Sequence, residues 1–417
     1  MEENPNQDPS ATTAADATST TTTNLNDLSQ DILLHILSFL PTLESITTSL
    51  ISKKWKSLWS LVPSLNFSYV HFPIYKNRYG CHVDSWVRYA IRNRVSELDL
   101  DFFIDESFHI VESEGRRDYD FPFSVPRNGK VRVLKLCRCD LTLPANMESM
   151  NLSSMKEIFF YQIYMTDDMV LNLLKACPNI EVLKLNCYGM ENLRLCSEKL
   201  KRLGLSSFYT AERELYLELD CPNLVWLSID CVETGEFCIK NLSSLIEFRT
   251  SIAHKTEHYG HWFKVVKQLH RIAHIKHLVV QNWWRKLAAK DGIPKDFLLH
   301  NLKHLELQTG YTQYDLLGMA TLLELCPNLE TIILDPLYKI DDDSLSEELL
   351  NKPIHFRIPS LKEVKLKVIP GENQNQIVQF VALLKKQGVV LDKIVLVPLY
   401  SGISISRRRP LRAEVNE

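Results

Sequence analysis

Two patterns of apolar residues divide the chain. Between Asp27 and Pro41, apolar residues recur at three- and four-residue spacing, which places them along one face of a helix. They are Leu28, Ile32, Leu33, Ile36, Leu37 and Leu40. Ser29 can cap this helix with its hydroxyl, and Pro41 ends it while suiting the first turn of the next helix. The pattern predicts two further short helices, 42–51 and 53–61.

From Val95 onward, a six-residue pattern replaces the helical one: apolar, two variable residues, apolar, one variable residue, apolar. Clear copies begin at Val95, Val131, Ile180, Leu200 and Leu302, and weaker copies at Met155, Leu224, Leu245, Ile275, Leu329 and Leu361. Its alternating end predicts a short strand whose apolar side chains point to one face. Successive copies begin mostly 20 to 32 residues apart, which indicates a repeat architecture.

Helical spacing between the strands completes the predicted repeat. The segments are 167–176 after a Thr166 cap, 262–272, 315–325 and 375–387. A Cys-Pro-Asn sequence at Cys177, Cys221 and Cys326 marks equivalent repeat positions, where a buried thiol, a helix-stopping Pro and an Asn bonded to local backbone are expected. We therefore predict an α/β repeat fold, in which stacked units of strand, turn and helix form a solenoid.

Composition narrows the class of partner. The chain has 417 residues, 48 Lys plus Arg and 51 Asp plus Glu, and this balance does not favour a nucleic-acid partner. Apolar runs are too short for a membrane span, so we expect no membrane partner. Residues 1–24 are polar and lack the pattern of a signal peptide, which predicts a disordered tail and a cytoplasmic or nuclear protein with reduced thiols. Residues 401–417 are expected to be a flexible tail.

Sequence signatures of catalysis are lacking. The chain has no Gly-rich phosphate loop, no Gly-x-Ser-x-Gly sequence and no Cys-x-x-Cys pairs at zinc-finger spacing. We accordingly expect no enzyme activity, no metal and no cofactor. The chemistry to be explained is protein binding.

Residues 25–68 resemble a plant-type F-box. The resemblance is carried by the Leu28–Pro41 helix pattern, the Ser-Lys-Lys-Trp sequence ending at Trp55, and a second Trp four residues later. Ser29 departs from the family, which usually has Pro there. The resemblance implies a three-helix motif that binds a Skp-type adaptor and, through it, a cullin. It assigns the adaptor-facing surface to Leu28, Ile32, Leu33, Ile36, Leu40, Pro41 and Trp55. It leaves Leu37, Leu50, Leu58 and Trp59 to pack within the motif or onto the first repeat.

The body resembles the leucine-rich repeats (LRRs) that follow plant F-boxes, over residues 69–358, and residues 359–400 resemble part of an FBD module that would cap the repeats. These resemblances imply a substrate receptor of an SCF-type cullin-RING ubiquitin ligase. The target, an unidentified protein, would contact the variable residue in the middle of each strand. The predicted stripe is Lys135, Lys184, Ser228, Arg249, Glu306 and Lys365. The alternative is an LRR scaffold that binds a partner without a role in ubiquitination, and whose F-box acts only in adaptor-linked assembly or not at all.

Overall fold

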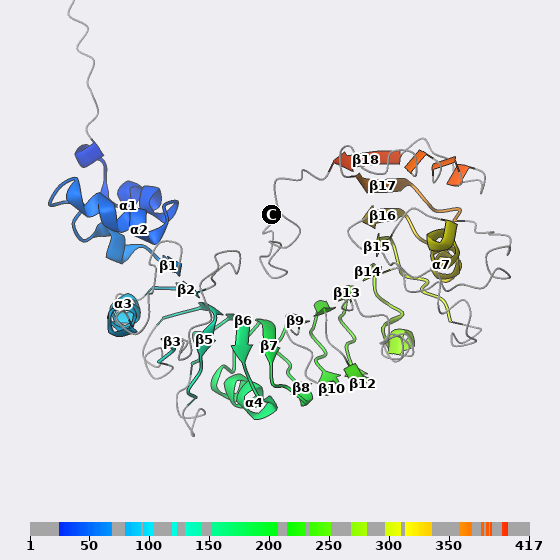
Figure 1. Cartoon of the computed structure of the whole chain (residues 1–417), viewed down its shortest axis with the longest axis horizontal. Helices are drawn as coiled ribbons and strands as arrows, with labels where there is room; N and C mark the ends of the chain where they lie inside the picture. The colour runs from blue at the N-terminus through cyan, green and yellow to red at the C-terminus, as the bar shows by residue number, and fades with distance from the viewer. Residues whose placement is uncertain are drawn as a thin grey trace, which may run out of the picture. The chain divides into compact units, whose positions relative to one another are not determined.

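The computed structural model describes most of the repeat body and the region before it. The described residues are 25–68, 80–92, 95–102, 119–122, 130–143, 152–206, 215–230, 234–251, 268–281, 297–309, 313–335, 358–368, 377–378, 381–382, 384–385 and 394–398. Both predicted tails, 1–24 and 401–417, lie outside them. The chain divides into two compact units, Met1–Val62 and Pro63–Glu417 (Figure 1).

The first unit, here called the helical unit, contains two α-helices in its described part: α1 (Gln30–Ser38) and α2 (Thr42–Thr47). Ser29 caps α1 as predicted, because its hydroxyl accepts a hydrogen bond from the amide of Ile32 (3.4 Å). Three 3-10 turns complete the unit: η1 (Leu25–Asp27), η2 (Thr48–Leu50) and η3 (Leu58–Leu61). The predicted third helix over 53–61 is therefore wrong except for η3. Polar side chains in 52–55 bond back to the start of the unit, and these contacts outweigh local helix propensity.

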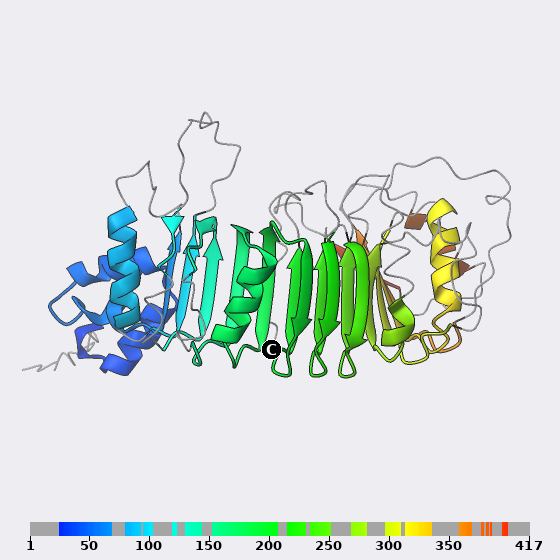
Figure 2. The same ribbon diagram turned by 90° about the horizontal axis from the view of Figure 1, so that it is seen from below.

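The second unit, here called the sheet unit, is built on one parallel sheet, with thirteen strands in the described residues (Figure 2). In spatial order they are β1 (Ser64–Ser68), β2 (Glu97–Asp101), β4 (Val133–Cys137), β6 (Glu157–Tyr164), β7 (Val182–Tyr188), β9 (Arg202–Ser206), β11 (Trp226–Asp230), β13 (Glu247–Ser251), β14 (His277–Gln281), β15 (His304–Gln308), β16 (Thr331–Asp335), β17 (Glu363–Val368) and β18 (Ile394–Pro398). All eleven predicted strand sequences form strands of this sheet. Their alternating apolar residues, such as Leu98 and Leu100, are fully buried.

Strand β1 is the first strand of the sheet unit. Residues 64–68 lie inside the predicted F-box, 25–68, and they pair in parallel with β2, from Ser64 opposite Glu97 to Ser68 opposite Asp101. The end of the F-box stays a prediction. The segment Val62-Pro-Ser-Leu-Asn-Phe67 follows the same six-residue pattern as the later strands. Its inward residues Leu65 and Phe67 are 1% and 2% exposed. The remaining predicted domain limits, at 358 and 400, stay predictions.

Helices cover one side of the sheet, the side to which the strand leucines point. Figure 1 shows α3 (Gly80–Arg92), α4 (Asp167–Ala176) and α7 (Gln313–Glu324) on this side. Helix α4 has its predicted bounds, with Thr166 as cap (Met169 N to Thr166 Oγ1, 3.3 Å). Of the predicted helix 262–272, the described part forms the 3-10 turn η6 (Leu269–Ile272). Most of the predicted helix 375–387 lies outside the described residues.

Strands replace the expected helix in the middle repeats. There β8 (Asn192–Cys196), β10 (Leu215–Asp220) and β12 (Thr234–Asn241) form a second parallel sheet in the order β12, β10, β8. A two-strand pair, β3 (Tyr119–Asp120) with β5 (Cys139–Asp140), lies earlier in the chain. The main-sheet sequence patterns around this region begin at positions 180, 200, 224 and 245, so the connections are short. A strand spans such a connection with fewer residues than a helix, because it rises about 3.3 Å per residue instead of about 1.5 Å.

Candidate functional site

The helical unit presents an apolar row on α1 to solvent. Ile32, Ile36 and Phe39 follow each other at positions i, i+4 and i+7, which places them on one face of the helix. Their side chains are 49%, 36% and 74% exposed. Leu33 and Leu37 lie on the neighbouring face and are 0% exposed. The single stripe predicted from the sequence is therefore two rows, one buried in the unit and one available to a partner.

The structure separates the seven predicted adaptor-facing residues into three groups. Ile32, Ile36 and Pro41 are exposed, while Leu28 and Leu40 are half-buried against the core of the unit. Leu33 and Trp55, at 0% and 2% exposure, lie inside that core with Leu37, Leu58 and Val62. The two side chains are therefore not exposed in the chain alone, and their contact with an adaptor stays a prediction. A unit of this size needs its largest side chains to form its own core. Leu33 and Trp55 therefore pack beneath the exposed row.

Asn26 closes the helical unit, and the sequence analysis missed it. Its Oδ1 accepts hydrogen bonds from Ser52 Oγ (2.8 Å) and Trp55 Nε1 (3.1 Å). Lys54 Nζ donates to the backbone oxygens of Asn26 (2.7 Å) and Leu28 (2.6 Å). Through these hydrogen bonds, the Ser-Lys-Lys-Trp sequence fixes the position of the segment that precedes α1. Asn26 gave no signal of its own, because an Asn just before a helix start is common in sequences. Its hydrogen-bond partners lie 26 and 29 residues away, so a local pattern could not reveal them.

Leu50 and Ile51 add a second exposed apolar position to this unit. They are 87% and 52% exposed, whereas the resemblance left Leu50 to pack within the motif or onto the first repeat. Leu58 is 4% exposed and does pack within the unit. Large apolar side chains exposed at this density on a small unit are typical of a protein-binding surface.

On the sheet unit, the predicted target-binding residues lie in one row. The strand registers align Lys135, Phe159, Lys184, Gly204, Ser228, Arg249, Val279, Glu306, Ile333 and Lys365 side by side. These residues alternate with the buried leucines and so point to the opposite face, here called the open face. All six predicted residues belong to this row. Their role in binding a target stays a prediction.

Most of the six already have polar partners within the sheet unit. Lys135 pairs with Glu97 (2.5 Å), Lys365 with Glu363 (3.1 Å) and Arg249 with Glu247. Ser228 Oγ donates to Asp230 (2.5 Å), and Glu306 accepts from Lys367 Nζ (2.5 Å). Lys184 is different. It is 4% exposed, and it makes no hydrogen bond or ion pair within the described part of the chain.

Aromatic rings surround Lys184. Its Nζ lies 5.5 Å from the ring centre of Phe159 and 5.0 Å from that of Trp226. Arg202 stacks on the same Trp226 ring (4.8 Å). Burial first, and then the positive charges of Arg202 and Arg249, lower the pKa of Lys184 to about 8. Phe159, Arg202 and Trp226 were not predicted as site residues, because only the strand register brings them to Lys184.

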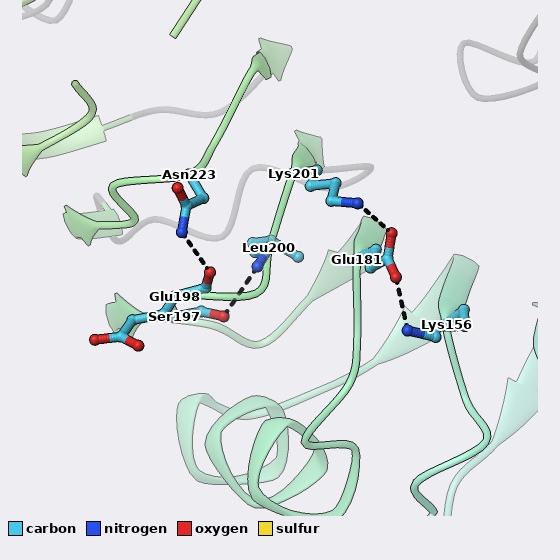
Figure 3. Close-up of polar contacts among 7 residues, drawn as sticks. All are labelled: Lys156, Glu181, Ser197, Glu198, Leu200, Lys201 and Asn223. Atoms are coloured by element: carbon cyan, nitrogen blue, oxygen red, sulfur yellow. Dashed lines mark hydrogen bonds and ion pairs between the residues drawn. The ribbon is translucent and has the colours of Figure 1, made fainter. Parts of the chain in front are cut away.

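Charged side chains link successive repeats at the residue just before each strand. Figure 3 shows Glu181 between Lys156 (2.6 Å) and Lys201 (2.7 Å), one residue from each of three consecutive repeats. The hydrogen bond from Lys156, followed in size by the one from Lys201, lowers the pKa of Glu181 to about 2. Glu330 repeats the arrangement with Lys303 (2.7 Å) and Lys362 (2.6 Å). In both triads a carboxylate joins the strands on either side of it.

The Cys-Pro-Asn sequences have the same structural role in all three copies. Cys177, Cys221 and Cys326 are at most 1% exposed, as expected, and burial raises the pKa of Cys177 to about 12. The Asn side chains do not bond local backbone. They donate to a carbonyl of the preceding repeat: Asn179 to Ser153 (2.9 Å), Asn223 to Glu198 (2.8 Å; Figure 3) and Asn328 to His300 (3.0 Å). These sequences therefore mark contacts between repeats.

Other chemistry is not evident in the described residues. They contain no group of three or more His, Cys, Asp or Glu side chains placed to hold a metal ion. None of their helices has the length and apolar character required to cross a membrane. Eight described cysteines, from Cys137 to Cys326, are free thiols.

Comparison with known proteins gives the family. The model of the LRR domain of At1g61320/AtMIF1 matches residues 61–392, and the F-box domain model matches residues 25–67. FBD-associated F-box protein At5g53635 of Arabidopsis thaliana is 24% identical, covering 89% of this chain and 94% of the relative. F-box/FBD/LRR-repeat protein At2g26030, also from Arabidopsis thaliana, is 23% identical over 89% of this chain and 91% of its own.

These families share a mode of action. F-box domains generally bind Skp-type adaptors, and F-box/LRR proteins are generally non-catalytic substrate receptors of SCF ubiquitin ligases. The LRR match covers more than half of this chain and begins just before β1, the first strand of the sheet unit. The chain belongs to the F-box/LRR-repeat proteins of the plant type, with an F-box at 25–67 and an At1g61320/AtMIF1-type LRR domain at 61–392.

Proposed function

We propose that this chain is a substrate-receptor subunit of an SCF-type cullin-RING ubiquitin ligase. The exposed row of Ile32, Ile36 and Phe39 docks a Skp-type adaptor, which connects the chain to a cullin. The repeats stack as an LRR solenoid whose open face holds a target protein. One observation carries the proposal: in the segment that matches an F-box, an apolar helix face lies outside the core of its own unit.

The energetics of that face support docking. Burying one large apolar side chain contributes about 1.5–3 kcal/mol relative to leaving it in water. Three such side chains on one helix face form the centre of an interface, although the ordering cost of association offsets part of this gain. The neighbouring buried row of Leu33 and Leu37 holds α1 in place, so little reorganisation is needed on binding.

The proposed mechanism is one of proximity. A target on the open face and a ubiquitin-charged enzyme on the cullin would belong to one complex, which raises their effective concentration relative to each other. Transfer chemistry would then come from the other subunits. The free thiols fit a reducing compartment, and we place the complex in the cytoplasm or nucleus.

Co-purification of the adaptor with the full chain tests the docking step. With a Skp-type adaptor and a cullin co-expressed, Ile36→Asp should abolish recovery of both, because a carboxylate replaces an apolar side chain at the centre of the row. Ser38→Asp is the matched control: it places the same charge on α1, on the opposite side of the helix, at an exposed position. Wild type and Ser38→Asp should recover both partners equally.

Two results would contradict the proposal. Equal recovery with wild type and Ile36→Asp would show that the row is not the docking surface. Recovery of the adaptor without cullin, together with ubiquitination that is unchanged when the chain is added, would favour the alternative of a scaffold that takes no part in the ligase.

A further inference from the structure

Lys184 is the exception in the row of the open face. Five of the six residues predicted to face a target are paired with a side chain of the sheet unit, and Lys184 has no such partner in the described residues. It is also among the most buried of them, at 4% exposure. A buried ammonium group normally has hydrogen-bond acceptors, since burial without them is costly.

Lys367 shows how the same face treats an ordinary buried lysine. Burial by itself would lower the pKa of Lys367, but hydrogen bonds to Glu306 (2.5 Å) and Asp335 (2.9 Å) outweigh it and raise the pKa. At Lys184 burial is the largest influence and the pKa is lowered. The sheet unit therefore supplies two carboxylates to one lysine and leaves the other to two aromatic rings.

The side chain of Lys184 lies on the open face, between residues of the neighbouring strands. Gly204 lies next to it in register and has no side chain, so Lys184 reaches across β9 to the ring of Trp226 on β11. Phe159 on β6 forms the other wall. Arg202, which is exposed, stacks on Trp226 and brings a second positive charge. Aromatic faces attract a cation, but they do not accept its hydrogen bonds as a carboxylate does.

The same strand also holds a buried polar atom that lacks a partner. Asn186 lies two residues beyond Lys184 and is 3% exposed. Its Nδ2 donates to Ser206 Oγ (2.8 Å), while its Oδ1 receives no hydrogen bond. Lys184 has donors without acceptors and Asn186 has an acceptor without a donor.

We infer that Lys184, together with Arg202 and the walls of Phe159 and Trp226, is a recognition site for the carboxylate of an Asp or Glu residue in a target protein. This inference rests on the proposed function and names the chemistry of its target. A single negative charge suits the site better than a phosphate dianion. The negative charge of Glu157 is close enough to raise the pKa of Lys184. Glu247 accepts hydrogen bonds from Trp226 Nε1 (3.2 Å) and Arg249, so two carboxylates already lie near the site.

Selection from a random peptide library tests the site. The probe is the purified full chain, and the readout is the residue preference at each peptide position. Wild type should enrich Asp or Glu at one position, and replacing that residue by Gln in the best peptide should weaken binding about tenfold or more. Lys184→Met should lose both the enrichment and the difference between the two peptides.

Two further variants separate recognition from folding. Lys135→Met removes a cation that also lies over Phe159, at 5.7 Å, but that already pairs with Glu97, so it should keep the acidic preference. Arg202→Gln changes an exposed side chain and should weaken the preference without unfolding the sheet unit. If Lys184→Met does not fold, loss of the preference in Arg202→Gln decides the question.

Several outcomes would overturn the inference. They are selection of no peptide, selection without an acidic position, an acidic preference that survives Lys184→Met, and a preference for phosphoserine over Glu. The co-purification of adaptor and cullin is measured separately. A chain that assembles with them but shows no acidic preference refutes only the recognition site, whereas a chain that selects acidic peptides but binds no adaptor refutes only the ligase assignment.

Discussion

The helical unit and the sheet unit treat their large apolar side chains in opposite ways. The helical unit buries five of them, Leu33, Leu37, Trp55, Leu58 and Val62, and leaves Phe39 and Leu50 74% and 87% exposed. In the sheet unit the first strand leucine of each clear repeat, from Leu98 to Leu305, is 0% exposed. One unit has a small core beside an uncovered apolar face, and the other has a continuous core shared between repeats.

Size explains the difference. A motif of about 40 residues is near the lower limit for independent folding, because it exposes much of its surface even when folded. Each repeat of the sheet unit is smaller still, yet its neighbours cover it on both sides, so burial extends along the array. An apolar face therefore stays exposed in the first unit and becomes an internal contact in the second.

Removing the centre of the small core should have the largest effect. Trp55→Ala deletes a 2%-exposed ring and its hydrogen bond to Asn26, and such a change costs about 3–5 kcal/mol. We expect the amides of α1 to lose protection from hydrogen exchange while those of β7 keep it. Exchange measured by mass spectrometry resolves the two regions.

Adding a Skp-type adaptor sharpens this test. Because a ligand that binds the folded form stabilises it, the adaptor should restore part of the protection of α1 in Trp55→Ala. The comparison between the units would fail if β7 lost protection together with α1. Equal protection in wild type and variant would show that Trp55 is not a core residue of the helical unit.

A glycine in the sheet unit tests how closely neighbouring repeats fit. Gly189 has φ +99°, and a Cβ there would lie 2.5 Å from Tyr164 Cε2 and 3.1 Å from the carbonyl oxygen of Met165. Gly189→Ala should destabilise the sheet unit by about 1–3 kcal/mol, since an L side chain is strained at this φ. The urea midpoint, followed by circular dichroism, measures it.

Tyr164 separates the two sources of that cost. The double variant Tyr164→Ala with Gly189→Ala removes the steric clash and leaves the backbone strain. Its destabilisation relative to Tyr164→Ala should be smaller than that of Gly189→Ala relative to wild type. A cost that is the same in both backgrounds would assign the whole effect to the backbone.

The strands of the sheet could be predicted because their signal is local. The six-residue pattern carries its own alternation, so each copy identifies a strand without knowledge of the others. Strand β1 follows the pattern too, but it directly follows the helical motif and was assigned to it. The second sheet has alternating leucines, such as Leu193 and Leu195, that the expectation of a helix concealed.

The sites were less accessible to sequence reasoning. Helical spacing placed Ile32 and Ile36 correctly on an apolar face, yet it could not tell them from Leu33 and Leu37, which lie about 100° further round the helix. That distinction depends on where Trp55 and Leu58 pack, some twenty residues later. The residues around Lys184 come from β6, β9 and β11, so they are known only when the register of four strands is known.

The asparagine contacts between repeats should have a moderate effect. Asn223→Ala removes the hydrogen bond to the Glu198 carbonyl (2.8 Å), and a bond of this kind contributes about 0.5–1.5 kcal/mol net. We expect the free energy of unfolding to fall by an amount in that range, measured from the shift of the urea midpoint. Asn179→Ala and Asn328→Ala should give similar losses. Exchange of the helical unit should not change in any of the three. Unequal shifts would mean that the three copies do not share one role.

The charged triads should have the smallest effect and a characteristic dependence on pH. Glu181→Gln removes ion pairs with Lys156 and Lys201 that lie on the surface, where such pairs contribute about 0–1 kcal/mol. Because the two lysines hold the pKa of Glu181 near 2 in the folded state, below its usual 4.5, the carboxylate stabilises the fold fully above about pH 5. As the pH falls from there toward 2, Glu181 takes up a proton and this contribution disappears. The difference in urea midpoint between wild type and Glu181→Gln should therefore be constant at neutral pH, shrink below pH 5, and also shrink in high salt at pH 7. A difference that grew on acidification would mean that Glu181 destabilises the sheet unit, and that the link between these repeats is made by the backbone alone.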